Sequence, residues 1–201
     1  MATRDPAPRP EHARADGPER GAPLSDAEVL RLMELLFFAY RDFVSDPDAM
    51  LAEIGFGRAH HRVIHFVGRH PGLRVSELLD ILRITKQSLG RVLRELIDRG
   101  YVYQQEGETD RRQRLLFLTE EGRALHARLA APQKARIRRA LAEAGPEAAE
   151  VFARTLLNIV NPEDRARVQA LLDSADAGAG SDHGSGGGTG GGNGGRRGSL
   201  A

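Results

Sequence analysis

The chain has 201 residues and a formal net charge of +1, from 29 basic and 28 acidic side chains. It contains no cysteine, which excludes disulfide bridges, thiolate metal sites and thiol redox switches. Its apolar runs, such as residues 35–40, are far shorter than the ~20 residues that cross a bilayer. The N-terminus also lacks the apolar stretch of a secretory signal. We therefore expect a soluble, cytoplasmic protein, and we look for its partners in local rather than overall charge.

Composition separates the two ends of the chain from its middle. Twelve of the 23 glycines follow residue 177, and five of the 10 prolines lie before residue 24. Ends of such biased composition cannot bury enough apolar surface to fold. We predict disordered tails over residues 1–23 and 175–201, around one domain over residues 24–174.

Apolar residues at helical spacing predict the first two helices. Ser25 and Glu28 have the spacing of a capping box, which starts a helix over about residues 25–45. Asp46–Pro47 is expected to end this helix. Apolar residues occupy most of its circumference, which favours burial in an interface. A second helix is expected from about Gly57 to Arg69.

The next segment predicts two helices joined by a short turn. Residues 75–82 form the first helix, and Arg83–Ile84 supplies the turn. Thr85 is a suitable N-cap for a second helix that reaches Arg99, and Gly100 is a suitable residue to end it. Two helices with this separation make up a helix-turn-helix unit.

After Gly100 the apolar period changes from 3.6 to 2 residues. Residues 101–103 and 115–118 are strand candidates, and the segment between them is polar. This pattern predicts a β-hairpin, a wing over residues 103–115. The fold class is therefore mainly α with a small β-hairpin wing, an α+β winged helix-turn-helix.

Three further helices are expected after the wing. Thr119 caps a long helix through Glu143, which Pro132 should kink or divide. Gly145–Pro146 starts a second, and the third runs from Glu163 to Leu172.

The helix over residues 85–99 carries a local excess of positive charge. The segment from Arg83 to Arg99 has five basic and two acidic residues, which suits the phosphates of DNA. Polar side chains in its first turn can bond to base edges or phosphates, although a solvated charged face is the alternative. The candidate DNA-contacting residues here are Thr85, Lys86, Gln87, Ser88, Arg91 and Arg94.

The wing contains a second basic group, formed by Arg111, Arg112 and Arg114. An arginine at a wing tip can enter the narrow, electronegative minor groove, and a neighbouring aspartate can hold its guanidinium in place. We assign the insertion to Arg112 and the support to Asp110. By itself the segment could be a solvated charged turn, but its position next to the helix-turn-helix favours a role at DNA.

Five segments carry a family resemblance: Val75–Leu79, Ile84–Leu89, Leu96–Val102, Asp110–Arg112 and Leu118–Gly122. They resemble the MarR family of winged helix-turn-helix transcription regulators. Residues 57–62 together with residues 84–89 are similar to the PetP-like branch of that family. The whole resemblance extends from about Leu30 to Val160.

The resemblance implies a homodimer on a pseudo-palindromic operator, with one recognition helix and one wing per subunit. It implies dimerisation helices over about residues 25–45 and 146–172, and a DNA-binding lobe over about residues 57–119. Family wings often carry Asp-x-Arg-Asp, of which Gly107–Asp110 keeps only the last residue. Contacts of the lost arginine are therefore not carried over.

Many members of the family respond to small aromatic acids or to cysteine oxidation. The absence of cysteine closes the second route. For the first, the resemblance implies a pocket between the dimerisation helices and the DNA-binding lobe. A small-molecule effector of unknown identity is therefore an open expectation.

Histidines gather in the second helix. His60, His61 and His65 lie within six residues, and the last two have the i, i+4 spacing that can bind one metal ion. A zinc site needs further ligands. We therefore favour packing near the dimer interface, with a metal or pH sensor as the alternative.

Three classes of function follow from these patterns. A DNA-binding transcriptional regulator is favoured, and a winged-helix module that binds protein without sequence-specific DNA binding is the alternative. The sequence contains no nucleophile elbow, P-loop, dinucleotide fingerprint or paired metal carboxylates. We therefore expect neither an enzyme, nor a cofactor, nor a membrane partner.

Overall fold

The computed structural model describes residues 23–107 and 110–181 of the chain. These residues belong to two compact units that divide after Arg41, within the first helix. Among the described residues, no helix combines the length and the apolar character needed to span a membrane. The predicted N-terminal tail lies outside the described residues except for Pro23.

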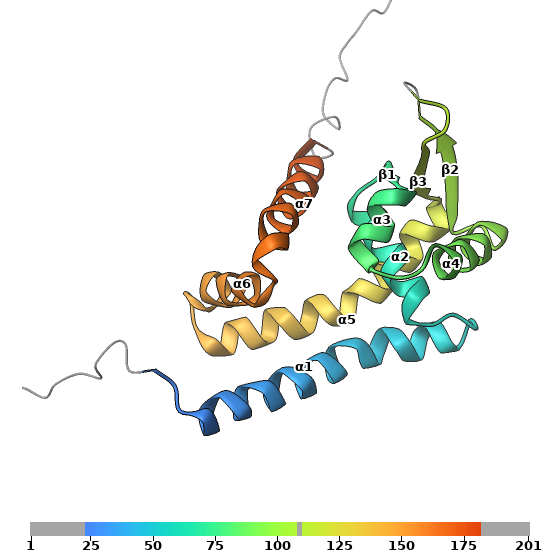
Figure 1. Cartoon of the computed structure of the whole chain (residues 1–201). Helices are drawn as coiled ribbons and strands as arrows, with labels where there is room; N and C mark the ends of the chain where they lie inside the picture. The colour runs from blue at the N-terminus through green and yellow to red at the C-terminus, as the bar shows by residue number, and fades with distance from the viewer. Residues whose placement is uncertain (1–22, 108–109, 182–201) are drawn as a thin grey trace, which may run out of the picture. The chain divides into compact units, whose positions relative to one another are not determined.

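The described residues form seven helices and a small antiparallel sheet (Figure 1). In chain order the elements are α1 (Asp26–Ala52), α2 (Arg58–Arg69), β1 (Leu73–Arg74), α3 (Val75–Leu82), α4 (Lys86–Asp98), β2 (Val102–Glu106), β3 (Arg114–Leu118), α5 (Glu120–Ala144), α6 (Ala148–Ile159) and α7 (Pro162–Ser181). The predicted fold class, mainly α with a β-hairpin wing, is confirmed.

The sheet differs from the prediction by one strand. Its order is β1-β3-β2, so the hairpin of β2 and β3 is joined by the two-residue strand β1, in which Leu73 pairs with Leu116. A two-residue strand leaves no periodic signal in a sequence. Strand β2 also continues beyond Tyr103, because residues 104–106 pair in register with β3. The hairpin projects beyond helices α2 to α4 (Figure 1).

Helix α1 does not end at Asp46–Pro47, and that prediction was wrong. The helix runs through the buried Pro47 to Ala52. A proline inside a helix leaves the carbonyl four residues earlier without its N–H donor. The amide Nε2 of Gln133 in α5 donates a hydrogen bond to that carbonyl, the oxygen of Phe43, at 3.2 Å. This side-chain bond compensates for the missing backbone bond, so the helix continues.

Helices α5 and α7 depart from the pattern that the sequence predicted. Helix α5 continues undivided through Pro132. Helix α7 runs to Ser181, so the first seven residues of the predicted glycine-rich tail are helical, and residues 182–201 lie outside the described residues. Ala175 is buried, and Asp176 accepts a hydrogen bond from Arg69 at 2.9 Å. These contacts explain why the helix extends beyond Leu172.

One apolar core joins helices α2 to α5, the sheet and the end of α1. The recognition helix predicted from the sequence contributes one complete face to it. Its buried residues are Leu89, Val92, Leu93 and Leu96. They pack with fully buried residues of the other elements, among them Leu51, Val63, Ile64, Val67, Leu78, Leu116 and Leu129. The opposite face of α4 is therefore turned outward.

The start of α5 closes tightly on the chain between α4 and β2. The hydroxyl of Thr119 accepts a hydrogen bond from the Gly122 amide at 3.0 Å and donates one to the Gly100 carbonyl at 2.6 Å. A Cβ atom on Gly122 would lie 2.0 Å from the carbonyl oxygen of Tyr101. Only glycine fits this contact. Gly100 has a φ of +74°, which agrees with its predicted place after the helix end.

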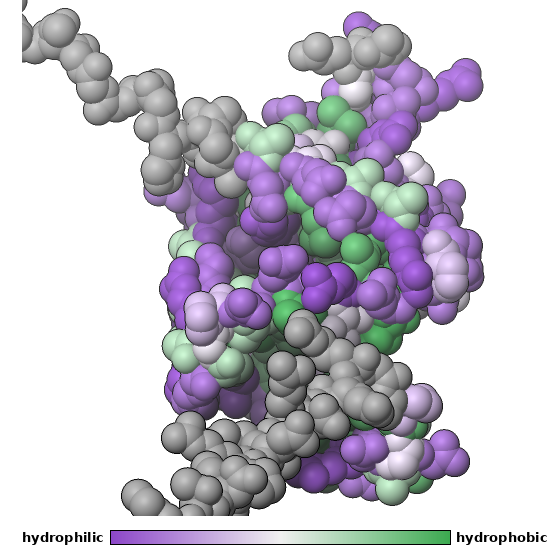
Figure 2. Space-filling view, turned by 90° about the vertical axis from the view of Figure 1, so that its left-hand side faces the viewer, coloured by the Kyte–Doolittle hydropathy of each residue, from purple (hydrophilic) through white to green (hydrophobic). Residues whose placement is uncertain are grey.

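The helical part of the first unit that the structure describes is the segment of α1 over residues 26–41. It exposes nearly all of its large apolar side chains, of which Phe37 is 63% exposed and Met33 60% exposed. In the second unit, α6 also exposes apolar residues, including Phe152 and Ile159. Figure 2 shows hydrophobic surface lying among hydrophilic side chains on the face in view. Exposed apolar area of this extent is typical of protein interfaces.

We expect Gly122→Ala to lower the free energy of unfolding by about 2 to 3 kcal/mol, because the new methyl group overlaps a backbone oxygen that cannot move freely. Urea denaturation of the full chain measures this effect. The matched control is Gly90→Ala in α4, where an added Cβ has no neighbour within 4 Å. The control should be neutral or stabilising by up to about 1 kcal/mol. Equal losses in both variants would contradict the close contact at Gly122.

Candidate nucleic-acid interface

The first turn of α4 is fixed by its N-cap. The Thr85 hydroxyl accepts a hydrogen bond from the Ser88 amide at 3.1 Å and donates one to the Ser88 hydroxyl at 2.9 Å. Thr85 is therefore the predicted N-cap, and its side chain is committed to the helix. Ser88 is half-buried, whereas Lys86 and Gln87 are exposed. The polar groups that this turn offers outward come mainly from those two residues.

The outward face of α4 carries three cations that have no acidic partner in the part of the chain that the structure describes: Lys86, Arg91 and Arg94. A shallow hollow of about 490 Å³ follows this face. Its lining consists of Gln87, Ser88, Gly90, Arg91 and Arg94. Gly90 has no side chain, and an added Cβ atom there would have no neighbour within 4 Å, so the helix backbone is accessible within the hollow.

Two of the five basic residues counted in the sequence hold the fold instead. Arg83 forms an ion pair with Asp164 in α7. Arg99 donates a hydrogen bond to the Ile54 carbonyl at 2.6 Å, and its guanidinium lies 4.1 Å from the centroid of the Phe56 ring. The net charge of +3 predicted for this segment therefore overstates what the face offers. Sequence spacing could not reveal these partners, which lie far along the chain.

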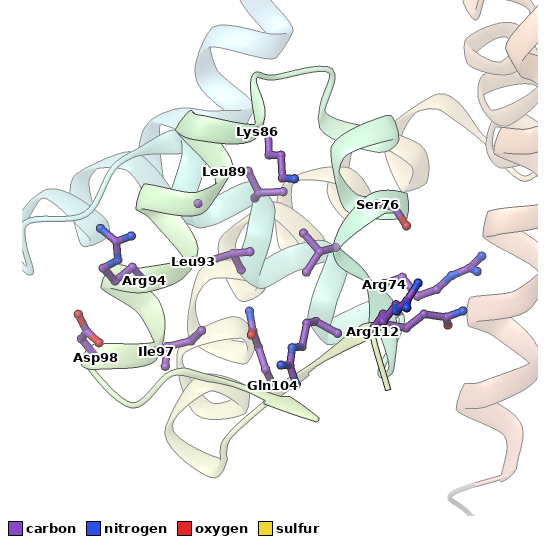
Figure 3. A pocket seen from close by; sticks show the side chains of 14 residues that line it. Arg74, Ser76, Lys86, Leu89, Leu93, Arg94, Ile97, Asp98, Gln104 and Arg112 are labelled. Atoms are coloured by element: carbon purple, nitrogen blue, oxygen red, sulfur yellow. The ribbon is translucent and has the colours of Figure 1, made fainter. Parts of the chain in front are cut away.

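A groove of about 600 Å³ separates α4 from the wing (Figure 3). Lys86 and Arg94 belong to its α4 side, and Arg112 lies on the opposite side. Its apolar lining comes from Val75, Leu89, Leu93 and Ile97. Arg74, Ser76 and Gln104 also line the groove, and neither Ser76 nor Gln104 was predicted from the sequence as a site residue. Gln104 could have been noticed as a polar residue beside the strand candidate at residues 101–103.

The wing tip is organised by Asp110, although not in the predicted way. Its carboxylate Oδ1 accepts a hydrogen bond from the backbone amide of Arg112 at 2.9 Å. Asp110 therefore supports the turn itself, and among the described residues no ion pair joins it to a guanidinium. Arg111 and Arg112 are exposed. Arg114 pairs with Glu106 on the neighbouring strand at 2.8 Å, so its charge is already balanced.

The histidines of α2 have separate environments. The Gly57 amide donates to Nδ1 of His60 at 3.2 Å, which leaves Nε2 to donate to Glu95 at 2.8 Å. Burial lowers the pKa of His61. Burial, together with the nearby ring of His126, lowers the pKa of His65 to about 4. The ring centroids of His65 and His126 are 5.6 Å apart. These shifts favour neutral, packed imidazoles.

A metal site at His61 and His65 would need further ligands. Within residues 23–107 and 110–181, no group of three or more histidine, cysteine, aspartate or glutamate side chains is arranged to hold a metal ion. The packing role near the dimer interface that the sequence favoured for these histidines stays a prediction.

The depressed pKa of His65 predicts acid sensitivity of the fold. An unfolded histidine titrates near 6.5, whereas His65 in the folded chain titrates at about 4. Between these values the unfolded chain binds the proton more readily, so stability decreases as the pH falls from about 6.5 to about 4. As the pH falls over this range, we expect the free energy of unfolding of His65→Phe to decrease by about 2 kcal/mol less than that of the wild type. Parallel curves from urea denaturation at each pH would contradict this assignment.

Comparison with known proteins gives a consistent result. A family model described as "MarR family" matches residues 54–113. The chain is 46% identical over 151 residues to the HTH-type transcriptional regulator PetP of Rhodobacter capsulatus, and the match covers 75% of this chain and 91% of that protein.

Solved structures resemble the fold over most of their own length. FabT of Streptococcus pneumoniae, solved in complex with DNA, has a TM-score of 0.57 at 22% identity and covers 65% of this chain and 94% of that chain. The transcriptional repressor CouR, bound to a 23-mer DNA duplex, has a TM-score of 0.52 at 25% identity and covers 70% and 100%, respectively.

Proposed function

The chain belongs to the MarR family of transcriptional regulators, and from that premise we propose that it binds a pseudo-palindromic DNA operator as a homodimer. In this proposal the recognition helix, residues 85–99, enters the major groove, and the wing, residues 103–115, reaches the adjacent minor groove. The observation that carries the proposal is the set of unbalanced cations on the outward face of α4, opposite an exposed wing arginine across one groove.

The first turn of α4 has the chemistry to read bases. A major groove admits an α-helix, and its base edges accept bonds from lysine and pair bidentately with the amide of glutamine. Lys86 and Gln87 are exposed at the helix N-terminus, while Thr85 and Ser88 secure the turn. Arg91 and Arg94 follow on the same face and suit phosphate contacts. Gly90 lets the backbone approach the duplex closely.

The wing has the chemistry for a minor groove. Narrow minor grooves concentrate negative potential and attract arginine. The side chain of Arg112 is exposed, and its backbone amide donates a hydrogen bond to the Asp110 carboxylate. This bond fixes the turn from which the arginine side chain extends. Arg111 can add a phosphate contact, and Arg114 contributes less because of its pair with Glu106. FabT and CouR, which have similar folds, were solved in complex with DNA, and this supports DNA binding by the present chain.

Substitutions at Gln87 and Arg112 distinguish base recognition from sequence-independent binding to DNA. On an operator selected from random duplexes, Gln87→Ala should relax discrimination at one base position by about 1 to 3 kcal/mol and leave binding to random DNA unchanged. Arg112→Ala should weaken binding to both DNAs and reduce the slope of log affinity against log salt by about 1. Fluorescence anisotropy at several salt concentrations measures both effects.

Arg114→Ala is the matched control, because it removes the same charge from the same wing at a position already paired with Glu106. Its loss of affinity should be smaller than that of Arg112→Ala. Equal losses on operator and random DNA for Gln87→Ala would remove its reading role. A wild-type chain that binds no duplex even at low salt would instead support the alternative, a winged-helix module that binds protein.

The exposed apolar surfaces support a homodimer. Helical residues 26–41 carry large apolar side chains around most of the helix, and α6 carries a second exposed group, including Val151 and Phe152. A monomer would leave both in water, at a cost that rises with the apolar area exposed. Burial against a second copy removes that cost and supplies two reading helices.

We expect the full chain to sediment as a dimer at micromolar concentration and to protect two half-sites about 34 to 36 Å apart on DNA. Phe37→Glu should weaken the dimer by about 2 kcal/mol or more, because a charge replaces an apolar anchor. Phe37 is 63% exposed in the single chain, so the fold of each copy should persist. The control is Glu34→Lys, which changes the charge of a polar side chain on the same helix and should leave the dimer intact. A monomeric wild type, or one unpaired half-site, would contradict the dimer.

The response to a small-molecule effector stays a prediction. It is supported by a cavity of about 300 Å³ in the second unit, between the end of α1, α2 and α5. Its lining is largely apolar and includes Phe43 and Ile137, with Lys134 and Arg138 as cationic members. This combination suits a small organic anion.

A further inference from the structure

Four charged residues join the helix-turn-helix to α7. Asp80 and Arg83 are three residues apart at the end of α3, and Asp164 and Arg167 are three residues apart at the start of α7. Arg83 donates to the Asp164 carboxylate, and Arg167 lies 4.0 Å from the Asp80 carboxylate. Each of the two segments therefore contributes one acidic and one basic side chain, and each of these faces the opposite charge on the other segment. We call these four residues the charge cluster.

Asp164 is the centre of the charge cluster. Its side chain is only 17% exposed, whereas that of Arg83 is 60% exposed. It also accepts from Arg167 at 3.4 Å, and Arg167 reaches the backbone carbonyl of Asp80 at 3.4 Å. A carboxylate shared by two guanidiniums is held from two sides. Exposed ion pairs contribute little to folding stability, so position is the more important consequence of this arrangement.

The charge cluster acts on the residue that sets the turn. Arg83 has a φ of +50° and is the only non-glycine residue with positive φ among the described residues. Such a conformation persists where the surroundings hold it. Two residues later, Thr85 caps α4. The ion pair of Arg83 with Asp164 therefore restrains the backbone two residues before the N-cap of the recognition helix. Farther along α7, Asp176 pairs with Arg69 of α2, so α7 is tied to this lobe at a second level.

We propose that the charge cluster is a positioning device that uses α7 to set the orientation of the recognition helix for its operator. The inference rests on the proposed function, because it concerns how well α4 meets DNA. Asp80, Arg83, Asp164 and Arg167 are positioning residues that act through the turn and need not touch the duplex. Loss of the tie leaves the lobe folded but lets the start of α4 vary in orientation.

Charge reversals on the two sides test the proposal, because they have opposite effects on the net charge. Arg83→Glu removes positive charge, whereas Asp164→Arg adds it. If only long-range attraction to phosphate mattered, Asp164→Arg would strengthen DNA binding. We expect both variants to lower operator affinity at least about fivefold, the lower end of ordinary coupling between sites. The double variant, which restores the pair in reverse, should return to within about twofold of the wild type.

Two further variants distinguish loss of the ion pairs from loss of the fold and from a general effect of charge. Arg83→Gly removes the tie, and glycine adopts positive φ without strain, so it should keep the turn and still lower operator affinity. Arg58→Glu reverses a charge in the pair with Asp48, outside the proposed dimer surfaces and DNA contacts, and should leave operator affinity close to that of the wild type. Urea denaturation of the full chain should give similar stabilities for all variants.

Hydrogen exchange in the DNA-free chain gives a second readout. Amides in the first turn of α4 should exchange faster in Arg83→Glu and recover in the double variant. Tighter DNA binding by Asp164→Arg, or failure of the double variant to recover in both readouts, would overturn the positioning role. If the wild type binds no duplex, the proposed function fails, and the exchange data alone decide whether the charge cluster orders α4.

Discussion

The structure depends on one constraint, the division of α4 into a buried face and an outward face. Leu89, Val92, Leu93 and Leu96 pack into the core shared by α2, α3, α5 and the sheet. The burial of apolar surface is strongly favourable but has no direction of its own. Because the helix has a fixed period, burial of one face determines which side chains point outward. Once this face is buried, the side chains of Gln87, Arg91 and Arg94 must point away from the core. The candidate interface follows from how the lobe folds.

Positive charge in this region has two different uses. Arg83 and Arg99 are occupied by an ion pair and by a carbonyl and an aromatic ring, respectively, and they hold the ends of α4 in place. Lys86, Arg91 and Arg94 have no acidic partner in the described part of the chain. The same division recurs in the wing, where Arg114 is paired and Arg112 is exposed. A count of basic residues therefore overestimates the interface, and the partner of each must be known.

Local signals in the sequence were sufficient for most of the lobe. The capping role of Thr85, the helix end at Gly100 and the change of period at the wing all depend on neighbouring residues, and the structure agrees with each. The errors arose where a distant residue decided the outcome. Gln133 lets α1 continue past Pro47, and β1 forms only because Leu116 offers it a partner. The groove residues Arg74 and Gln104 likewise come together only through the tertiary fold.

The central claim is that the outward face of α4 meets bases in the major groove. Methylation interference on a duplex selected from random sequence tests it most directly, because methylation of guanine N7 modifies only the major-groove edge. We predict that methylated guanines within each half-site prevent binding by the full-length chain, in two clusters about one helical turn apart. Binding that tolerates methylation at every guanine, while the duplex is still bound specifically, would contradict it.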